Sequence, residues 1–187
     1  DISSQCLVTP VDPMVVSRGR AIECFSGEYR FLSNFYPVTV AYEGIVYPSV
    51  EHAYQAAKTL DANERQRIAG LSTPASAKRV GGFIDLRHDW QQVKVGIMLD
   101  LLRQKFADEA LGDLLLATGD CPLVEGNYWG DRFWGVCRGV GENWLGRLLE
   151  QVRGEVQAAR DGSDELGQDE VARETAEAIL ATCFGDG

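Results

Sequence analysis

A glutamate, a glutamine and a lysine recur within residues 47–58 at a spacing that could support chemistry. Glu51, Gln55 and Lys58 stand at positions i, i+4 and i+7, so a helix would place them on one face. Ser49 is a preferred N-cap residue, and the three alanines that follow it favour a helix. A carboxylate, an amide and an amine on one face form either a solvent-exposed stripe or part of a catalytic pocket, and their spacing is compatible with both.

The two charged residues of this face each have a chemical and an ordinary interpretation. Glu51 falls in the first helical turn, where the positive end of the helix dipole favours an ionised carboxylate that could serve as a base. Acidic residues are also common there simply because they stabilise the helix. Lys58 would become a nucleophile if burial lowered its pKa, and such an amine forms a Schiff base with the aldehyde of an opened sugar. An exposed lysine near a helix end is the plainer alternative.

Two later segments could contact a nucleotide. Residues 123–135 are dense in aromatic residues and broken by glycines, which suits stacking on a base or fixing a loop to the core. Residues 139–146 form a glycine-rich turn before a predicted helix, where free N–H groups could bind phosphate. The match to a dinucleotide-binding fingerprint is partial, because Trp144 stands where the third glycine is expected. A flexible loop with Asn143 as the helix N-cap explains this turn equally well.

The composition excludes several classes of protein. The 187 residues suffice for one domain with a core, and the net charge of −10 argues against tight, non-specific binding along a nucleic-acid backbone. The five cysteines are scattered without a CxxC pair and there are two histidines, so neither a disulfide framework nor a metal site is expected. Reduced thiols favour a cytoplasmic location. No apolar run approaches the roughly 20 residues of a membrane helix.

The pattern of the chain predicts a single, mostly helical α+β domain with a small β-sheet. We expect an appendage at residues 1–20, a globular domain at 21–155 and an acidic extension at 156–187 with one amphipathic helix at 170–180. In the longest expected helix, apolar residues form one stripe and Lys105 lies off it. The expected strands are residues 21–25, 38–42, 45–47 and 123–125, and the expected helices are residues 49–59, 62–70, 73–82, 90–106, 110–118 and 143–152.

Several segments together resemble the NADAR family, whose name refers to NAD and ADP-ribose. They occur in the family's order over roughly residues 22–153: 27–37 with Leu32-Ser33-Asn34-Phe35, 47–58, 86–94, 105–106, 114–119, 123–125, 131–135 with Asp131-Arg132-Phe133-Trp134-Gly135, and 139–146. The resemblance implies an α+β fold and an N-glycosidase that uses no cofactor and no metal. It associates two substrate classes with the family: early intermediates of riboflavin synthesis, and ADP-ribose attached to guanine.

The resemblance also implies which residues act. It assigns catalysis to Glu51 and Asp131, and Lys58 matches the lysine that handles the opened ribose. The expected substrate contacts are Trp134, Arg30, Ser33, Asn34, Phe35, Gly135 and Asn143. A second Trp-Gly step at Trp129 lies outside the family pattern.

Three functions follow as hypotheses. The first is release of ADP-ribose from ADP-ribosylated guanine in nucleic acid, which is the substrate we expect. The second is hydrolysis of a small riboflavin precursor. The third is a non-catalytic module that binds ADP-ribose or NAD.

Overall fold

The computed structural model describes residues 20–162. The predicted appendage at 1–20, apart from its last residue, and the predicted helix at 170–180 lie outside the described residues. The ordered elements are a 3-10 helix, five named helices and two short pairs of strands: η1 Gly27–Leu32, β1 Val40–Tyr42, β2 Ile45–Tyr47, α1 Val50–Ala56, α2 Ala62–Ala69, α3 Pro74–Val80, α4 Trp90–Phe106, α5 Glu109–Leu116, β3 Gly126–Asn127 and β4 Val136–Cys137. A further helix covers residues 144–162. The predicted α+β, mostly helical fold is confirmed.

Side-chain caps explain where the short helices begin. The Ser49 hydroxyl accepts a hydrogen bond from the His52 amide at the start of α1, and the Thr73 hydroxyl does the same for Ser76 at the start of α3. Each cap satisfies one of the amide groups that a helix start leaves without an internal partner. Pro74 occupies the first turn of α3, where a missing N–H carries no penalty. The starts of both helices were therefore predictable from sequence.

The predicted hairpin is confirmed. Strands β1 and β2 are antiparallel, with Val40 opposite Tyr47. The two residues of the turn, Glu43 and Gly44, have φ angles of 45° and 79°. A two-residue turn with both residues in the left-handed region matches the twist of the strands that it joins.

Two other predicted strands are wrong. Residues 21–25 and 123–125 meet only through a single parallel bridge between Ile22 and Leu123. The paired strands in this part of the chain are β3 and β4, which run parallel to each other. Side-chain alternation over three to five residues cannot reveal how far a ladder extends, because its length depends on a partner distant in sequence. The helix predicted at 143–152 begins at residue 144 and extends to residue 162.

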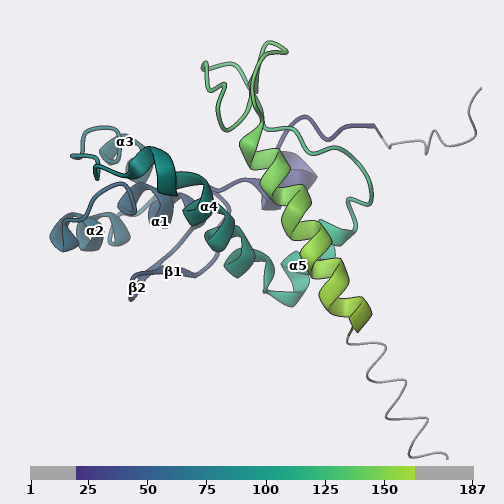
Figure 1. The fold of residues 1–187 in the computed structure, drawn as a ribbon, viewed down its shortest axis with the longest axis horizontal. Coiled ribbons are helices and arrows are strands. Elements are labelled where there is room, and N and C mark those ends of the chain that lie inside the picture. Colours follow the sequence, from purple (N-terminus) through teal and green to yellow (C-terminus); the bar gives the residue numbers. More distant parts are fainter. Residues whose placement is uncertain (1–19, 163–187) are drawn as a thin grey trace, which may run out of the picture.

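Helix α4 connects the two ends of the molecule (Figure 1). Helices α1, α2 and α3 gather toward one end of α4, whereas α5 and helix 144–162 lie toward the other. The core side of α4 presents Met98, Leu101, Leu102 and Phe106, which are all buried. Lys105 is also fully buried, so its expected place off the apolar stripe is wrong. Of the helices within residues 20–162, none has the length and apolar character needed to cross a membrane.

Candidate active site

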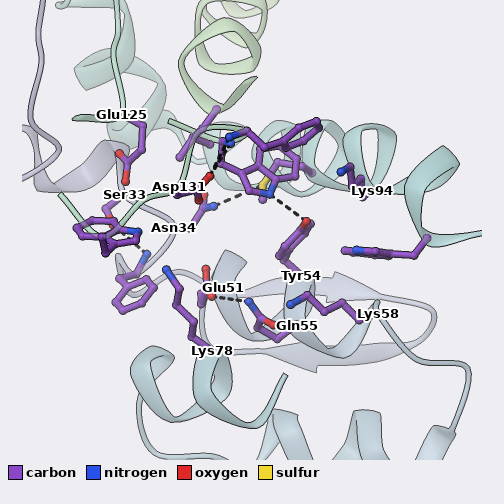
Figure 2. Close-up of a pocket in the computed structure, with 17 residues that line it drawn as sticks. Ser33, Asn34, Glu51, Tyr54, Gln55, Lys58, Lys78, Lys94, Glu125 and Asp131 are labelled. Carbon is purple, nitrogen blue, oxygen red and sulfur yellow. Dashed lines mark hydrogen bonds between the residues drawn. The ribbon is translucent and has the colours of Figure 1, made fainter. Parts of the chain in front are cut away.

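A half-enclosed cavity of about 580 Å³ lies where α1, α3 and α4 meet the loops at residues 33–35 and 125–134 (Figure 2). Its volume is within the range of small-molecule sites. Charged groups of both signs and aromatic rings share this one space. The lining residues are Ser33, Asn34, Phe35, Glu51, Tyr54, Gln55, Lys58, Lys78, Trp90, Lys94, Met98, Glu125, Trp129, Asp131, Phe133, Trp134 and Leu145.

The face of α1 that bears Glu51 and Gln55 forms one wall of this cavity. Both residues are buried, which excludes the solvent-exposed stripe for them. The Gln55 side-chain amide donates a hydrogen bond of 2.7 Å to Glu51 Oε1. Lys58 lies just beyond the C-terminus of α1, and its Nζ donates a hydrogen bond of 3.2 Å to the Gly81 carbonyl. The i, i+4, i+7 spacing therefore brings a carboxyl, an amide and an amine into one pocket.

Burial changes the acidity of both charged groups on this wall. Desolvation raises the pKa of Glu51, and the hydrogen bond from Gln55 and the nearby lysines offset only part of the rise. Burial thus acts against the helix dipole, which by itself would favour the ionised carboxyl. Desolvation also lowers the pKa of Lys58, while the neighbouring Glu51 opposes the change. A lowered pKa increases the share of neutral, nucleophilic amine.

Asp131 organises the loop that carries Trp134. Its Oδ1 accepts hydrogen bonds from the backbone amides of Phe133 at 3.1 Å and Trp134 at 2.9 Å. The Trp134 indole N–H then donates to the Tyr54 hydroxyl at 3.1 Å, and the two rings meet edge to face with centroids 5.3 Å apart. The aromatic loop is thus fixed to α1 and lines the cavity at the same time.

The segment Ser33–Asn34–Phe35 forms another wall. Its backbone is held from two sides: the Asn34 carbonyl accepts from the Glu51 amide at 3.0 Å, and Lys105 Nζ donates to the Ser33 carbonyl at 2.8 Å. Burial lowers the pKa of Lys105 to about 7. Lys105 therefore positions this wall from the protein interior rather than from the cavity.

Four lining residues of chemical interest were not predicted as site residues: Lys78, Lys94, Trp129 and Glu125. Lys78 Nζ lies 5.4 Å from the centre of the Trp129 ring, and Lys94 Nζ lies 3.5 Å from that of Phe133. Burial raises the pKa of Glu125 to about 7, and the negative charges of Asp131 and Glu51 add to the rise. Glu125 belongs to a segment of the family resemblance, but the sequence pattern predicts only a strand there.

Unpaired polar atoms concentrate at this cavity. In residues 20–162, five buried side-chain oxygen or nitrogen atoms have no hydrogen-bond partner. Three of them, Asn34 Oδ1, Gln55 Oε1 and Glu125 Oε2, belong to lining residues. Buried polar groups in folded proteins are almost always paired, so these three atoms are places where a ligand or water can bind.

Three predicted substrate contacts lie outside the lining. Arg30 is exposed on η1. Gly135 packs against the Glu125 carbonyl so closely that a side chain would overlap it. The Asn143 side chain accepts from the Glu125 amide at 3.0 Å and donates to the Leu123 carbonyl at 2.8 Å. Their direct contact with substrate stays a prediction, whereas Gly135 and Asn143 visibly shape the backbone around Glu125.

The described part of the chain contains no group of three or more His, Cys, Asp or Glu side chains arranged to hold a metal ion. Cys24, Cys121 and Cys137 are free thiols. The donor set of the cavity is instead carboxyl, amine and amide, which suits acid–base and nucleophilic chemistry.

Comparison with known proteins agrees with the fold. The NADAR domain matches residues 22–157. The chain is 39% identical over 135 residues to the N-glycosidase YbiA of Escherichia coli, covering 68% of this chain and 82% of that protein. It is 40% identical over 133 residues to the riboflavin biosynthesis protein VVA0006 of Vibrio vulnificus, covering 69% of this chain but only 36% of that protein.

The solved structure of E. coli YbiA matches this fold with a TM-score of 0.67 at 34% identity, covering 81% of this chain and 95% of that one. The prediction of a NADAR-type fold and of an N-glycosidase-type enzyme is confirmed at the level of the family. The chain belongs to the NADAR domain family.

Proposed function

We propose that the protein hydrolyses the bond between the anomeric carbon of a phosphorylated ribose and a nitrogen of a planar base. The observation that carries this proposal is the cavity at α1, which combines carboxyls, an amine with lowered pKa and aromatic walls with three unpaired polar atoms. Positive charge develops on the sugar when such a bond breaks, and carboxylates next to the sugar stabilise it. The name of the relative YbiA, an N-glycosidase, supports the same chemistry.

In this proposal Lys58 is the nucleophile and Glu51 moves protons for it. The neutral amine attacks the anomeric carbon as the base departs, the ribose ring opens to a Schiff base, and water then releases the sugar and restores the lysine. Glu51 is suited to proton transfer because burial raises its pKa above that of an exposed glutamate, so the carboxyl holds a proton more readily. Asp131 would stabilise the charged sugar, and Trp134 would stack on the departing base.

Borohydride reduction tests the covalent route. It converts a Schiff base to a stable secondary amine, so trapping during turnover should add the mass of the reduced sugar to the peptide that contains Lys58. Lys105 is the control lysine for this experiment. Its pKa is also lowered, but its amine faces the Ser33 carbonyl. Turnover with an unmodified Lys58 would exclude the covalent route and leave direct attack by water.

Two observations favour different bases on the ribose. Two of the relatives, from V. vulnificus and maize, are named riboflavin biosynthesis proteins, which favours an early riboflavin intermediate: a ribose phosphate linked to a pyrimidine. Besides Lys58, the cavity holds Lys78 from α3 and Lys94 from α4, and these two charges could neutralise more than one phosphate. That charge favours ADP-ribosyl guanine, free or within nucleic acid.

Mass spectrometry of the products separates these functions. An enzyme for the riboflavin intermediate releases ribose phosphate and a pyrimidine. An enzyme for ADP-ribosylated guanine releases ADP-ribose and restores the unmodified oligonucleotide. Binding of ADP-ribose without release of any base would instead identify a non-catalytic module and contradict the proposal.

A further inference from the structure

A carboxyl group on the wall opposite α1 has no role in the chemistry proposed above. Glu125 precedes β3 and points into the cavity from the loop side, whereas Glu51, Gln55 and Lys58 come from the α1 side (Figure 2). Its Oε2 atom is buried and has no hydrogen-bond partner. A buried carboxyl oxygen without a partner is unfavourable for stability, so its retention in a cavity calls for a functional explanation.

The backbone of Glu125 is held rigidly. Its N–H donates to Asn143 Oδ1 at 3.0 Å, and its carbonyl accepts from the Val136 amide at 2.8 Å. Gly135 closes over the same carbonyl, where any side chain would overlap it. The protein thus fixes the main chain on several sides while leaving one carboxyl oxygen free toward the cavity, which is the arrangement expected of a preorganised reactive group.

We infer that Glu125 is the acid that protonates the departing base, acting across the cavity from Lys58 and Glu51. This inference rests on the proposed function. As the bond from the anomeric carbon to nitrogen breaks, its electron pair goes to the nitrogen, which takes the proton from Glu125. Water supplies the hydroxyl group that ends on the anomeric carbon, and the proton that water releases returns to the Glu125 carboxylate.

The surroundings of Glu125 favour its protonated form. The charged groups that act on it are Asp131 on its own loop, Glu51 on α1 and Lys78 on α3. Burial raises its pKa most, Lys78 lowers it, and Asp131 and Glu51 add to the rise, so the pKa of Glu125 is about 7. An acid with a pKa near the working pH transfers its proton most effectively.

Glu125→Gln is the direct test, because glutamine keeps the size of the side chain but cannot act as an acid. We expect kcat/KM for base release to fall about 10²- to 10⁴-fold, the usual contribution of a general acid. Glu28→Gln, on the exposed first turn of η1, is the matched control and should retain wild-type activity. Glu125→Asp keeps the acid on a shorter chain and should recover part of the activity.

Two further readouts separate an acid from a structural residue. Wild-type activity should decline as the pH rises above about 7 because the acid form is lost, and the residual activity of Glu125→Gln should lack that decline. The thermal midpoint of Glu125→Gln should equal or exceed that of the wild type, because a partly buried ionisable group is replaced by a neutral amide of the same size. A Glu125→Gln variant within threefold of wild-type activity, with an unchanged pH profile, would overturn the inference while leaving the proposed function intact. A wild-type protein that releases no base would overturn both.

Discussion

Lys105 provides the sharpest physical test of the structure that supports the cavity. The residue is fully buried, and within residues 20–162 no carboxylate forms an ion pair with its ammonium. Its Nζ donates a hydrogen bond of 2.8 Å to the Ser33 carbonyl. Burial lowers its pKa from an ordinary value of 10.5 to about 7. At about 1.4 kcal/mol for each pKa unit, keeping this side chain charged in the folded state costs about 5 kcal/mol.

The direction of the pH dependence follows from proton binding. The folded pKa is below the unfolded one, so the unfolded state binds more protons between pH 7 and 10.5 and the free energy of unfolding rises with pH across that window. Lys105→Met removes this dependence and also removes a hydrogen bond to a buried carbonyl, a loss of about 1–3 kcal/mol. The variant should therefore be more stable than wild type by about 2–4 kcal/mol at pH 7, and less stable at pH 10.

Urea unfolding followed by tryptophan fluorescence at several pH values between 7 and 10 measures this effect. The stability difference between Lys105→Met and wild type should change by about 1.4 kcal/mol per pH unit and reverse its sign. Arg79→Met removes an exposed positive charge at the end of α3 and should give a difference that hardly varies with pH. A pH-independent difference for Lys105→Met would refute the reasoning, because it would mean that Lys105 titrates alike in the folded and unfolded states.

Two further substitutions test how the cavity walls are built. Gly81→Ala would place a methyl group on Gln55 Oε1 and displace Gln55 from Glu51. We expect it to lower the free energy of unfolding by about 1–3 kcal/mol, measured by thermal unfolding, and to abolish activity, measured by base release. The control is Gly96→Ala in α4, where the added methyl group faces open space and should stabilise the protein. Equal changes of stability and activity in the two variants would show that Gln55 is not displaced. Trp134→Phe removes the indole donor to Tyr54 and should raise KM at least tenfold in steady-state kinetics, whereas an unchanged KM would show that Trp134 does not contact the substrate.

The helices and the hairpin could be predicted because their signals are local. Ser49 and Thr73 cap the helices that they precede, and the Glu43–Gly44 turn determines the hairpin. The strands expected at 21–25 and 123–125 depend on contacts a hundred residues apart, which no local pattern encodes. For the same reason the burial of Lys105 was not predicted: its neighbours Ser33 and Tyr36 come from a distant segment.

The site was predictable in part. Helical spacing brings Glu51, Gln55 and Lys58 together, and the family motif adds Asp131 and Trp134, all of which line the cavity. Spacing could not indicate burial, and burial moves the pKa of Glu51 in the direction opposite to that expected from the helix dipole. Lys78 and Lys94 reach the cavity from α3 and α4, whose orientation is set by packing.

The central claim is that the cavity at α1 cleaves a bond between ribose and nitrogen. The most direct measurement compares the wild type with Glu51→Gln for cleavage of the ribose–nitrogen bond in a ribosylated substrate, together with the thermal midpoint of each. We predict that the wild type cleaves this bond and that Glu51→Gln cleaves it at least 100-fold more slowly, by loss of proton transfer, at an unchanged or higher thermal midpoint. Equal rates for the two proteins, or a parallel loss of activity and stability in Glu51→Gln, would contradict the proposed function.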